Sequence, residues 1–306
     1  TRRELATGNE IVLEGDMEGA PPDGEPLISG LMGMLYAAGY GTGRYQPEKA
    51  PVLFQQREDH GLFETTFDPP QRRLRLSVAD VLARHPHRDD ILKADRAIKD
   101  CLGPDEGLTL MTYCVRWNPE GDRMLFYFGN HNVIKDRGEP RLSYVFTADR
   151  ELEDIHLAVD LSFDRRGVHW SWHPDGKHLV GYGPDPEDAG KRCLAQVFYD
   201  GSDYKRLSRH ASGGHPSVSP KDHDLVVTDD TRINPGKVLF IDTAHDQVVR
   251  MYRLPRVYGA KEPPGRNPYR VCHHPVFDRQ GRKVLVNTLP DRHAVVCEIE
   301  VPGVSR

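Results

Sequence analysis

Short apolar runs separated by turns cover most of the chain, and they come in pairs. In each pair a second run follows the first after a polar loop. The first runs lie at residues 123–128, 177–182, 224–228 and 283–287, and the second runs at 142–146, 194–199, 237–241 and 294–298. Short runs rich in Val, Phe and Tyr between turn residues are typical of β-strands. The pattern predicts a mostly β protein built from repeated hairpins.

An eight-residue repeat stands before each first run. Its four copies begin at Cys114, His169, His215 and His274, so successive copies are 55, 46 and 59 residues apart. A large apolar residue occupies the fourth position of every copy, and Gly or Asp, which favour turns, occupies the eighth. A period near 45 residues with four short strands in each unit indicates the blades of a β-propeller. A solenoid or a β-sandwich is the alternative.

We therefore predict an all-β fold, a β-propeller of four-stranded antiparallel blades that residues 1–306 form as a single domain. Five blades are recognisable, and up to seven are compatible with the chain. The last repeat ends after its third strand, so we expect residues 9–13 to supply the strand that closes the last blade. Apolar residues within 77–101 recur at helical spacing and predict a helical insertion.

Composition narrows the choice of partners and location. Forty-six acidic and forty-one basic residues give a net charge of −5 without a basic block, so we expect no nucleic-acid partner. No stretch of eighteen uncharged apolar residues occurs, so we expect no membrane span. Five scattered cysteines favour buried thiols over disulfides or a zinc site. We expect a cytoplasmic protein, or a periplasmic one if a signal peptide has been removed.

The histidines of the repeat are the main candidates for chemistry. In a propeller, equivalent positions of the innermost strands converge on one axis, so His169, His215 and His274 are predicted to meet at one end of the channel. Imidazole suits both metal binding and proton transfer near neutral pH. Strand alternation would place Cys272 and Arg270 on the face of His274, with His273 on the opposite face. A structural role for all three histidines is the alternative.

On the segments Gly-Val-His169-Trp, Gly-Gly-His215-Pro and Cys272-His-His274-Pro, residues 110–300 resemble the oligogalacturonate lyases. These are seven-bladed propellers related in repeat style to TolB-like domains, and they act in pectin degradation. The resemblance implies a divalent metal, with manganese expected, held by three histidines and a glutamine, and a histidine as Brønsted base. His169 matches the base, and His215 and His274 match metal ligands.

Two of the four ligand positions differ from that pattern. Cys272 stands where the resemblance implies a further ligand, and Tyr269 stands where it implies the glutamine. We retain Cys272 as a metal-ligand candidate. His273 and Asn267 are the candidates to replace the missing ligands.

The implied reaction is β-elimination across C4–C5 of a uronate in a short acidic oligosaccharide. It needs a base for the proton next to the carboxylate and positive charge to neutralise that carboxylate. Arginine forks suit this second task, and the candidates are Arg141, as part of the catalytic machinery, and Arg270 and Arg232, as substrate-binding residues.

Two other functions stay open. One is a non-catalytic TolB-like propeller that binds a protein or a glycan through its loops, which the changes at Cys272 and Tyr269 favour. The other is a propeller glycosidase using Asp229 and Asp230, although adjacent residues of a strand point to opposite faces. The sequence carries no G-x-S-x-G, H-E-x-x-H or phosphate-loop signature.

Overall fold

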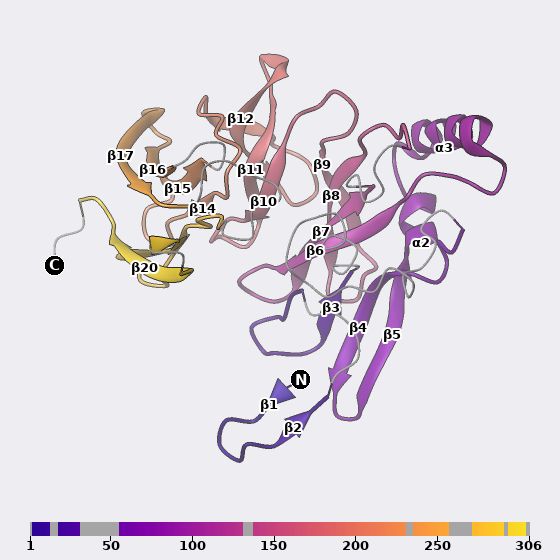
Figure 1. The fold of residues 1–306 in the computed structure, drawn as a ribbon, viewed down its shortest axis with the longest axis horizontal. Coiled ribbons are helices and arrows are strands. Elements are labelled where there is room, and N and C mark those ends of the chain that lie inside the picture. The colour runs from indigo at the N-terminus through magenta and orange to yellow at the C-terminus, as the bar shows by residue number, and fades with distance from the viewer. Residues whose placement is uncertain are drawn as a thin grey trace. The chain divides into compact units, whose positions relative to one another are not determined.

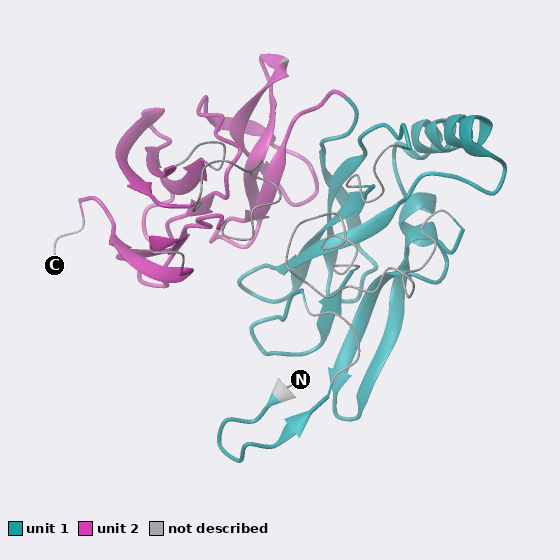
Figure 2. Ribbon diagram, viewed as in Figure 1, with its two compact units in different colours: residues 1–163 teal, residues 164–306 magenta. Residues whose placement is uncertain are grey.

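A computed structural model describes residues 2–12, 18–30, 55–130, 137–230, 235–256, 271–290 and 293–303. The chain divides into two compact units, residues 1–163 and 164–306, shown in teal and magenta in Figure 2. Each unit is described by itself below. That residues 1–306 form one domain stays a prediction.

The described part of the first unit contains three antiparallel sheets (Figure 1). The four-stranded sheet has its strands in chain order: β6 (Met111–Trp117), β7 (Arg123–Gly129), β8 (Ser143–Asp149) and β9 (Ile155–Asp160). The three-stranded sheet consists of β3 (Leu27–Ser29), β4 (Gly61–Phe67) and β5 (Pro70–Ser77). A two-stranded sheet pairs β1 (Arg2–Arg3) with β2 (Glu10–Ile11).

The pairing of β2 bears on the predicted role of the N-terminal strand. Glu10 and Ile11 lie within the segment 9–13, and their strand partner in the structure is β1. The last blade lies in the other unit. Closure of that blade by residues 9–13 therefore stays a prediction.

Two helices occupy the segment in which the sequence predicts a helical insertion. Helix α2 (Val78–Ala83) begins with a capping box, in which Ser77 and Asp80 each accept a hydrogen bond from the other's backbone N–H. Helix α3 (Arg88–Leu102) buries Ile91 and Ile98 in the same core that holds Val78 of α2. The insertion at 77–101 is confirmed. Neither helix is long and apolar enough to cross a membrane, and no other described helix is.

The described part of the second unit contains three antiparallel sheets, again with strands in chain order. The first is β10 (Val168–Trp172), β11 (His178–Asp185), β12 (Asp188–Phe198) and β13 (Lys205–Ser208). The second is β14 (Ser217–Val218), β15 (Leu225–Asp230), β16 (Gly236–Asp242) and β17 (Gln247–Leu254). The third is β18 (Val276–Phe277), β19 (Lys283–Thr288) and β20 (Val295–Glu300).

Adjacent sheets of this unit pack face to face through apolar side chains. Val180 and Tyr182 of the first sheet lie in one cluster with Val226 of the second. On its other face the second sheet contributes Phe240 to a cluster with Val286 of the third. Consecutive antiparallel meanders packed in this way are propeller blades, here two of four strands and one of three described strands. The predicted all-β propeller fold is confirmed.

The repeat motif forms the turn between the first two strands of each blade. Its fifth residue donates its backbone N–H across the turn in every copy, with N···O distances of 2.8 to 2.9 Å. At the eighth position Gly121, Gly176 and Gly281 have φ of 76°, 69° and 64°, the left-handed region that favours glycine. At Ser219 the turn is one residue longer, since the bond reaches Leu225. In each blade that carries the motif, this turn therefore fixes the position of the first strand relative to the second.

Candidate functional site

The three histidines at the first repeat position lie in contact in the second unit. The ring centroids of His169 and His215 are 3.9 Å apart, and those of His215 and His274 are 3.5 Å apart with 25° between the ring planes. All three side chains are therefore brought to one point, as the repeat geometry predicts. We call them the histidine stack.

A local break in strand geometry orients two members of the stack. His169 and His274 have φ of 59° and 42°, which is uncommon for residues other than glycine. The pairing of β10 with β11 shifts register between Val168 and Ser171, so His169 lies in a β-bulge. β18 is only two residues long and begins after His274. Side-chain alternation therefore does not relate these histidines to the residues two positions away.

The ring of His169 is held by backbone carbonyls of the segment before His215. Its Nδ1 lies 2.8 Å from the oxygen of Gly214 and 3.2 Å from that of Gly213. A carbonyl oxygen only accepts hydrogen bonds, so Nδ1 carries the proton and the neutral ring has its lone pair on Nε2. This is the tautomer that a base acting through Nε2 requires.

Asp229 of β15 is the centre of the site, and its carboxylate is fully buried. Its Oδ1 accepts hydrogen bonds from the backbone N–H of His215 at 2.6 Å and from the ring Nδ1 at 2.9 Å. Its Oδ2 accepts from the backbone N–H of His273 at 3.2 Å and of His274 at 3.4 Å. One carboxylate thus fixes two members of the stack.

The electrostatics of Asp229 follow from these contacts. Burial raises the pKa of its carboxyl, but the two hydrogen bonds from His215 and the electrostatic attraction of the histidine rings outweigh burial and bring the pKa to about 2. Asp229 is therefore ionised at neutral pH. When the His215 ring is neutral and donates from Nδ1 to this carboxylate, the lone pair lies on Nε2, an arrangement common for metal-ligating histidines.

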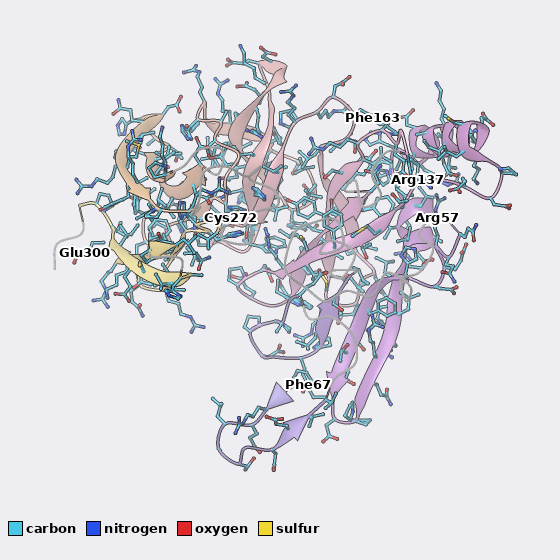
Figure 3. The ribbon with its side chains drawn as sticks, viewed as in Figure 1. Arg57, Phe67, Arg137, Phe163, Cys272 and Glu300 are labelled. Carbon is cyan, nitrogen blue, oxygen red and sulfur yellow. The ribbon has the colours of Figure 1, made fainter. Side chains whose placement is uncertain are left out.

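Cys272 and His273 occupy different surroundings from the stack. Cys272, labelled in Figure 3, is half-buried, and its Sγ lies 3.9 Å from a guanidinium nitrogen of Arg256, itself buried. The ring of His273 donates to the carbonyl of Asn287 at 2.7 Å, and its buried Nε2 lies against Gly236. Burial lowers the pKa of His273. These contacts give the His273 ring a packing role; its metal-ligand assignment stays a prediction.

Of the three predicted arginines, only Arg141 lies within the described residues. Arg141 lies in the first unit next to β8, where its backbone carbonyl accepts from Phe163 N at 2.7 Å. Arg232 and Arg270 lie outside the described residues, as do Tyr269 and Asn267. Their substrate-binding and catalytic assignments stay predictions.

The stack matches part of what a metal site needs. His215 and His274 supply imidazoles, and the bond to Asp229 orients the His215 ring through its Nδ1. Within the described residues, no group of three or more His, Cys, Asp or Glu side chains is arranged to hold a metal ion. The two imidazoles are the donor type that a divalent metal takes, and they would be two of its protein ligands.

Sequence reasoning missed Asp229 as the organiser of the site. It noted only the Asp229-Asp230 pair and interpreted it as an alternative glycosidase pair. The available signal was an acidic residue at the end of a strand of buried apolar residues, since a buried carboxylate needs partners. Those partners are up to 45 residues away in sequence, so the sequence does not identify them.

Comparisons with known proteins place the fold. No family model matches the chain, and no curated protein matches it. An oligogalacturonate lyase from Vibrio parahaemolyticus matches with a TM-score of 0.57 at 13% identity, over 98% of this chain and 71% of that one. An oligogalacturonate lyase in complex with manganese matches with a TM-score of 0.58 at 14% identity, over the same shares. The chain has the fold of the oligogalacturonate lyases, which confirms the resemblance at the level of fold.

Proposed function

We propose that this chain is a metal-assisted lyase that cleaves short uronate-containing oligosaccharides by β-elimination. The observation that carries the proposal is the histidine stack on the buried carboxylate of Asp229, in a fold shared with oligogalacturonate lyases. A carboxylate and two backbone carbonyls are used to hold the three imidazoles in place. A purely structural core would have apolar side chains at these positions and would need none of these hydrogen bonds.

In the proposed reaction His169 is the base. Its Nε2 takes the proton from C5 of the uronate, the electron pair forms the C4–C5 double bond, and the C4–O bond breaks. The leaving oxygen then takes a proton from solvent. The carbonyls of Gly213 and Gly214 stabilise the protonated ring of His169, because its Nδ1–H already points at them.

Positive charge next to the substrate carboxylate makes the C5 proton more acidic. A divalent metal, with manganese expected, would supply that charge, with His215 and His274 holding it. Asp229 fixes the ring of His215 through Nδ1 and so keeps Nε2 available as the ligating atom. Arg141, Arg232 and Arg270 are proposed to pair with substrate carboxylates.

The test is an elimination assay on oligogalacturonides, which follows the ultraviolet absorbance of the unsaturated product. We expect activity in the wild type and a loss of at least about 100-fold in His169→Ala and His215→Ala, as expected when a base or charge stabiliser is removed. His245→Ala is the matched control, since His245 forms a similar bond to Asp242 at 2.8 Å on an exposed surface.

The other functions are distinguished by the same assay. Full activity in both histidine variants would contradict the proposal. Products without the double bond would indicate a glycosidase. Binding of the oligosaccharide without any cleavage would indicate a propeller that binds a glycan.

A further inference from the structure

A cavity of about 490 Å³ lies in the second unit, where the β11–β12 hairpin meets the end of β13. Basic side chains dominate its wall. Those that line it are Arg166, Lys191, Arg192, Arg206 and Arg209. The three acidic lining residues are Asp185, Glu187 and Asp188.

The acidic residues neutralise only part of the basic wall. Arg206 holds both oxygens of Asp185, at 2.8 and 3.0 Å, and Glu187 at 2.9 Å. Lys191 pairs with Asp188 at 3.0 Å. These pairs involve all three acids of the wall, so the wall as a whole keeps an excess of positive charge.

Arg166 and Arg192 differ in their setting. The side chain of Arg166 is exposed to solvent at the cavity. Arg192 is half-buried, donates to the carbonyl of Ala211 at 3.0 Å, and lies over the ring of Tyr182. Arg209 adds a further exposed guanidinium, 3.5 Å from Asp246.

The cavity and the histidine stack share one segment, residues 211–214. The guanidinium of Arg192 lies against Gly213, so close that a side chain at Gly213 would come within 2.6 Å of it. The next residue, Gly214, holds the ring of His169. The hydroxyl of Tyr182 bonds to Ser212 at 2.7 Å and to Thr228, the neighbour of Asp229, at 3.2 Å. The wall with Arg192 is therefore built on the backbone that positions His169.

We propose that this cavity binds a second carboxylate of the substrate, on a sugar unit next to the one at His169. The inference rests on the proposed function and extends it: Arg192 and Arg166 would receive this carboxylate while His169 acts on its neighbour. A guanidinium binds a carboxylate through two parallel N–H donors, which fits the acidic sugar and not a neutral one. The cavity and the position at His169 together would then select a ligand with at least two carboxylates.

The test measures binding apart from catalysis. All variants carry His169→Ala so that the ligand is not cleaved, and titration calorimetry measures their affinity for trigalacturonate, galacturonate and a neutral galactose trisaccharide. We expect trigalacturonate to bind most tightly. Arg166→Gln and Arg192→Gln should each weaken it by about tenfold, the size of one charged hydrogen bond, and leave galacturonate unchanged.

Arg253→Gln is the matched control, an exposed arginine on β17 that does not line the cavity. Because Arg192 packs on Gly213 and its removal could disturb the fold, the exposed Arg166 keeps the test valid. Unchanged trigalacturonate affinity in Arg166→Gln and in a folded Arg192→Gln, or equal affinity for the neutral trisaccharide, would overturn the inference.

The two proposals fail separately. If the wild type does not cleave oligogalacturonides but trigalacturonate binding still depends on Arg166, the lyase proposal fails and the carboxylate site stands. If cleavage depends on His169 while binding ignores both arginines, the lyase proposal stands and the carboxylate site fails.

Discussion

Asp229 shows how a single buried side chain joins segments that are distant in sequence. Its two oxygens accept four hydrogen bonds, two from His215 and one each from the backbones of His273 and His274. A buried carboxylate is costly unless it is paired and fully bonded, and here both conditions are met. The geometry of the stack therefore depends on the charge of this one residue.

We expect Asp229→Asn to lower the free energy of unfolding by about 3 kcal/mol, because the amide presents a donor to N–H groups that need an acceptor. Elimination activity should fall with it. Urea unfolding at pH 7 measures the first effect and the product absorbance the second. The control is Asp242→Asn, whose bond to His245 lies on the surface and is screened by solvent, so this substitution should change the free energy of unfolding far less. Equal effects of the two substitutions would contradict this role.

The pH dependence of this contribution follows from the direction of its pKa shift. The folded pKa of Asp229, about 2, lies below its ordinary value of 3.8. The stabilisation is therefore fully present above pH 3.8 and is lost as pH falls towards 2, and it amounts to about 2 kcal/mol. The stability difference between wild type and Asp229→Asn should shrink over that range.

Asp229 is buried as a charged group, whereas His85 in the first unit is buried as a neutral ring. Its ring centroid lies 4.3 Å from that of Tyr144 and 5.2 Å from that of Phe146, and its Nδ1 accepts from the backbone of His87 at 2.9 Å. Burial, with the charge of His87, lowers its pKa from 6.5 to about 4.

His85 should therefore make the protein less stable in mild acid. The unfolded chain takes up the proton first, so stability is intact above pH 6.5 and falls by up to about 3 kcal/mol as pH decreases to 4. We expect His85→Phe to remove this dependence of stability on pH. The measurement is the free energy of unfolding in urea at pH 7, 6 and 5. If the stability of His85→Phe falls with pH as steeply as that of the wild type, other groups cause the loss of stability in acid.

At the scale of elements, the β10–β11 pair explains the position of His169. The bulge between Val168 and Ser171 gives His169 its left-handed backbone and turns Trp170 inward, where it is fully buried. The indole crosses β11 at Gly181 and Gly183, which have no side chain to obstruct it. The glycines of β11 and the bulge of β10 are therefore parts of one arrangement.

Gly181→Ala should destabilise this pair of strands. The added methyl group would lie 2.4 Å from the indole of Trp170, and such overpacking costs about 1–3 kcal/mol. Activity should also fall, because Trp170 adjoins His169. A double-mutant cycle with Trp170→Leu, followed by urea unfolding, checks the cause. If Gly181→Ala costs as much in the Trp170→Leu variant as in the wild type, contact with the indole is not the reason.

At the scale of the whole molecule, metal binding gives the clearest distinction between the proposed lyase and a binding propeller. An ion that binds only the folded protein stabilises it by about 2.7 kcal/mol at about one hundred times its Kd. We expect manganese to raise the melting temperature of the wild type and elemental analysis to find about one ion per chain. Both effects should be absent in His215→Ala and present in His245→Ala. No metal in any of the three proteins would favour the binding propeller.

The repeat carried by the sequence determined the blades, since its turns depend on local residues. Gly121, Gly176 and Gly281 mark hairpins because the backbone there needs a positive φ. The equivalent positions of His169, His215 and His274 in that repeat were enough to predict that they meet. The helical insertion followed in the same way from apolar spacing. These features depend on periodicity, which a single sequence shows.

Only the tertiary structure decided what holds the histidines and what lies beside them. The alternation that would place Cys272 with His274 fails because β18 is short and His274 has a left-handed backbone. The partners of Asp229 lie 14 to 45 residues away, and Arg192 of β12 meets Gly213 in the segment between β13 and β14. Such contacts depend on how strands pair and bulge. The sequence determines which blades form and where their histidines lie; the packing determines which nitrogen of His169 and of His215 carries the proton.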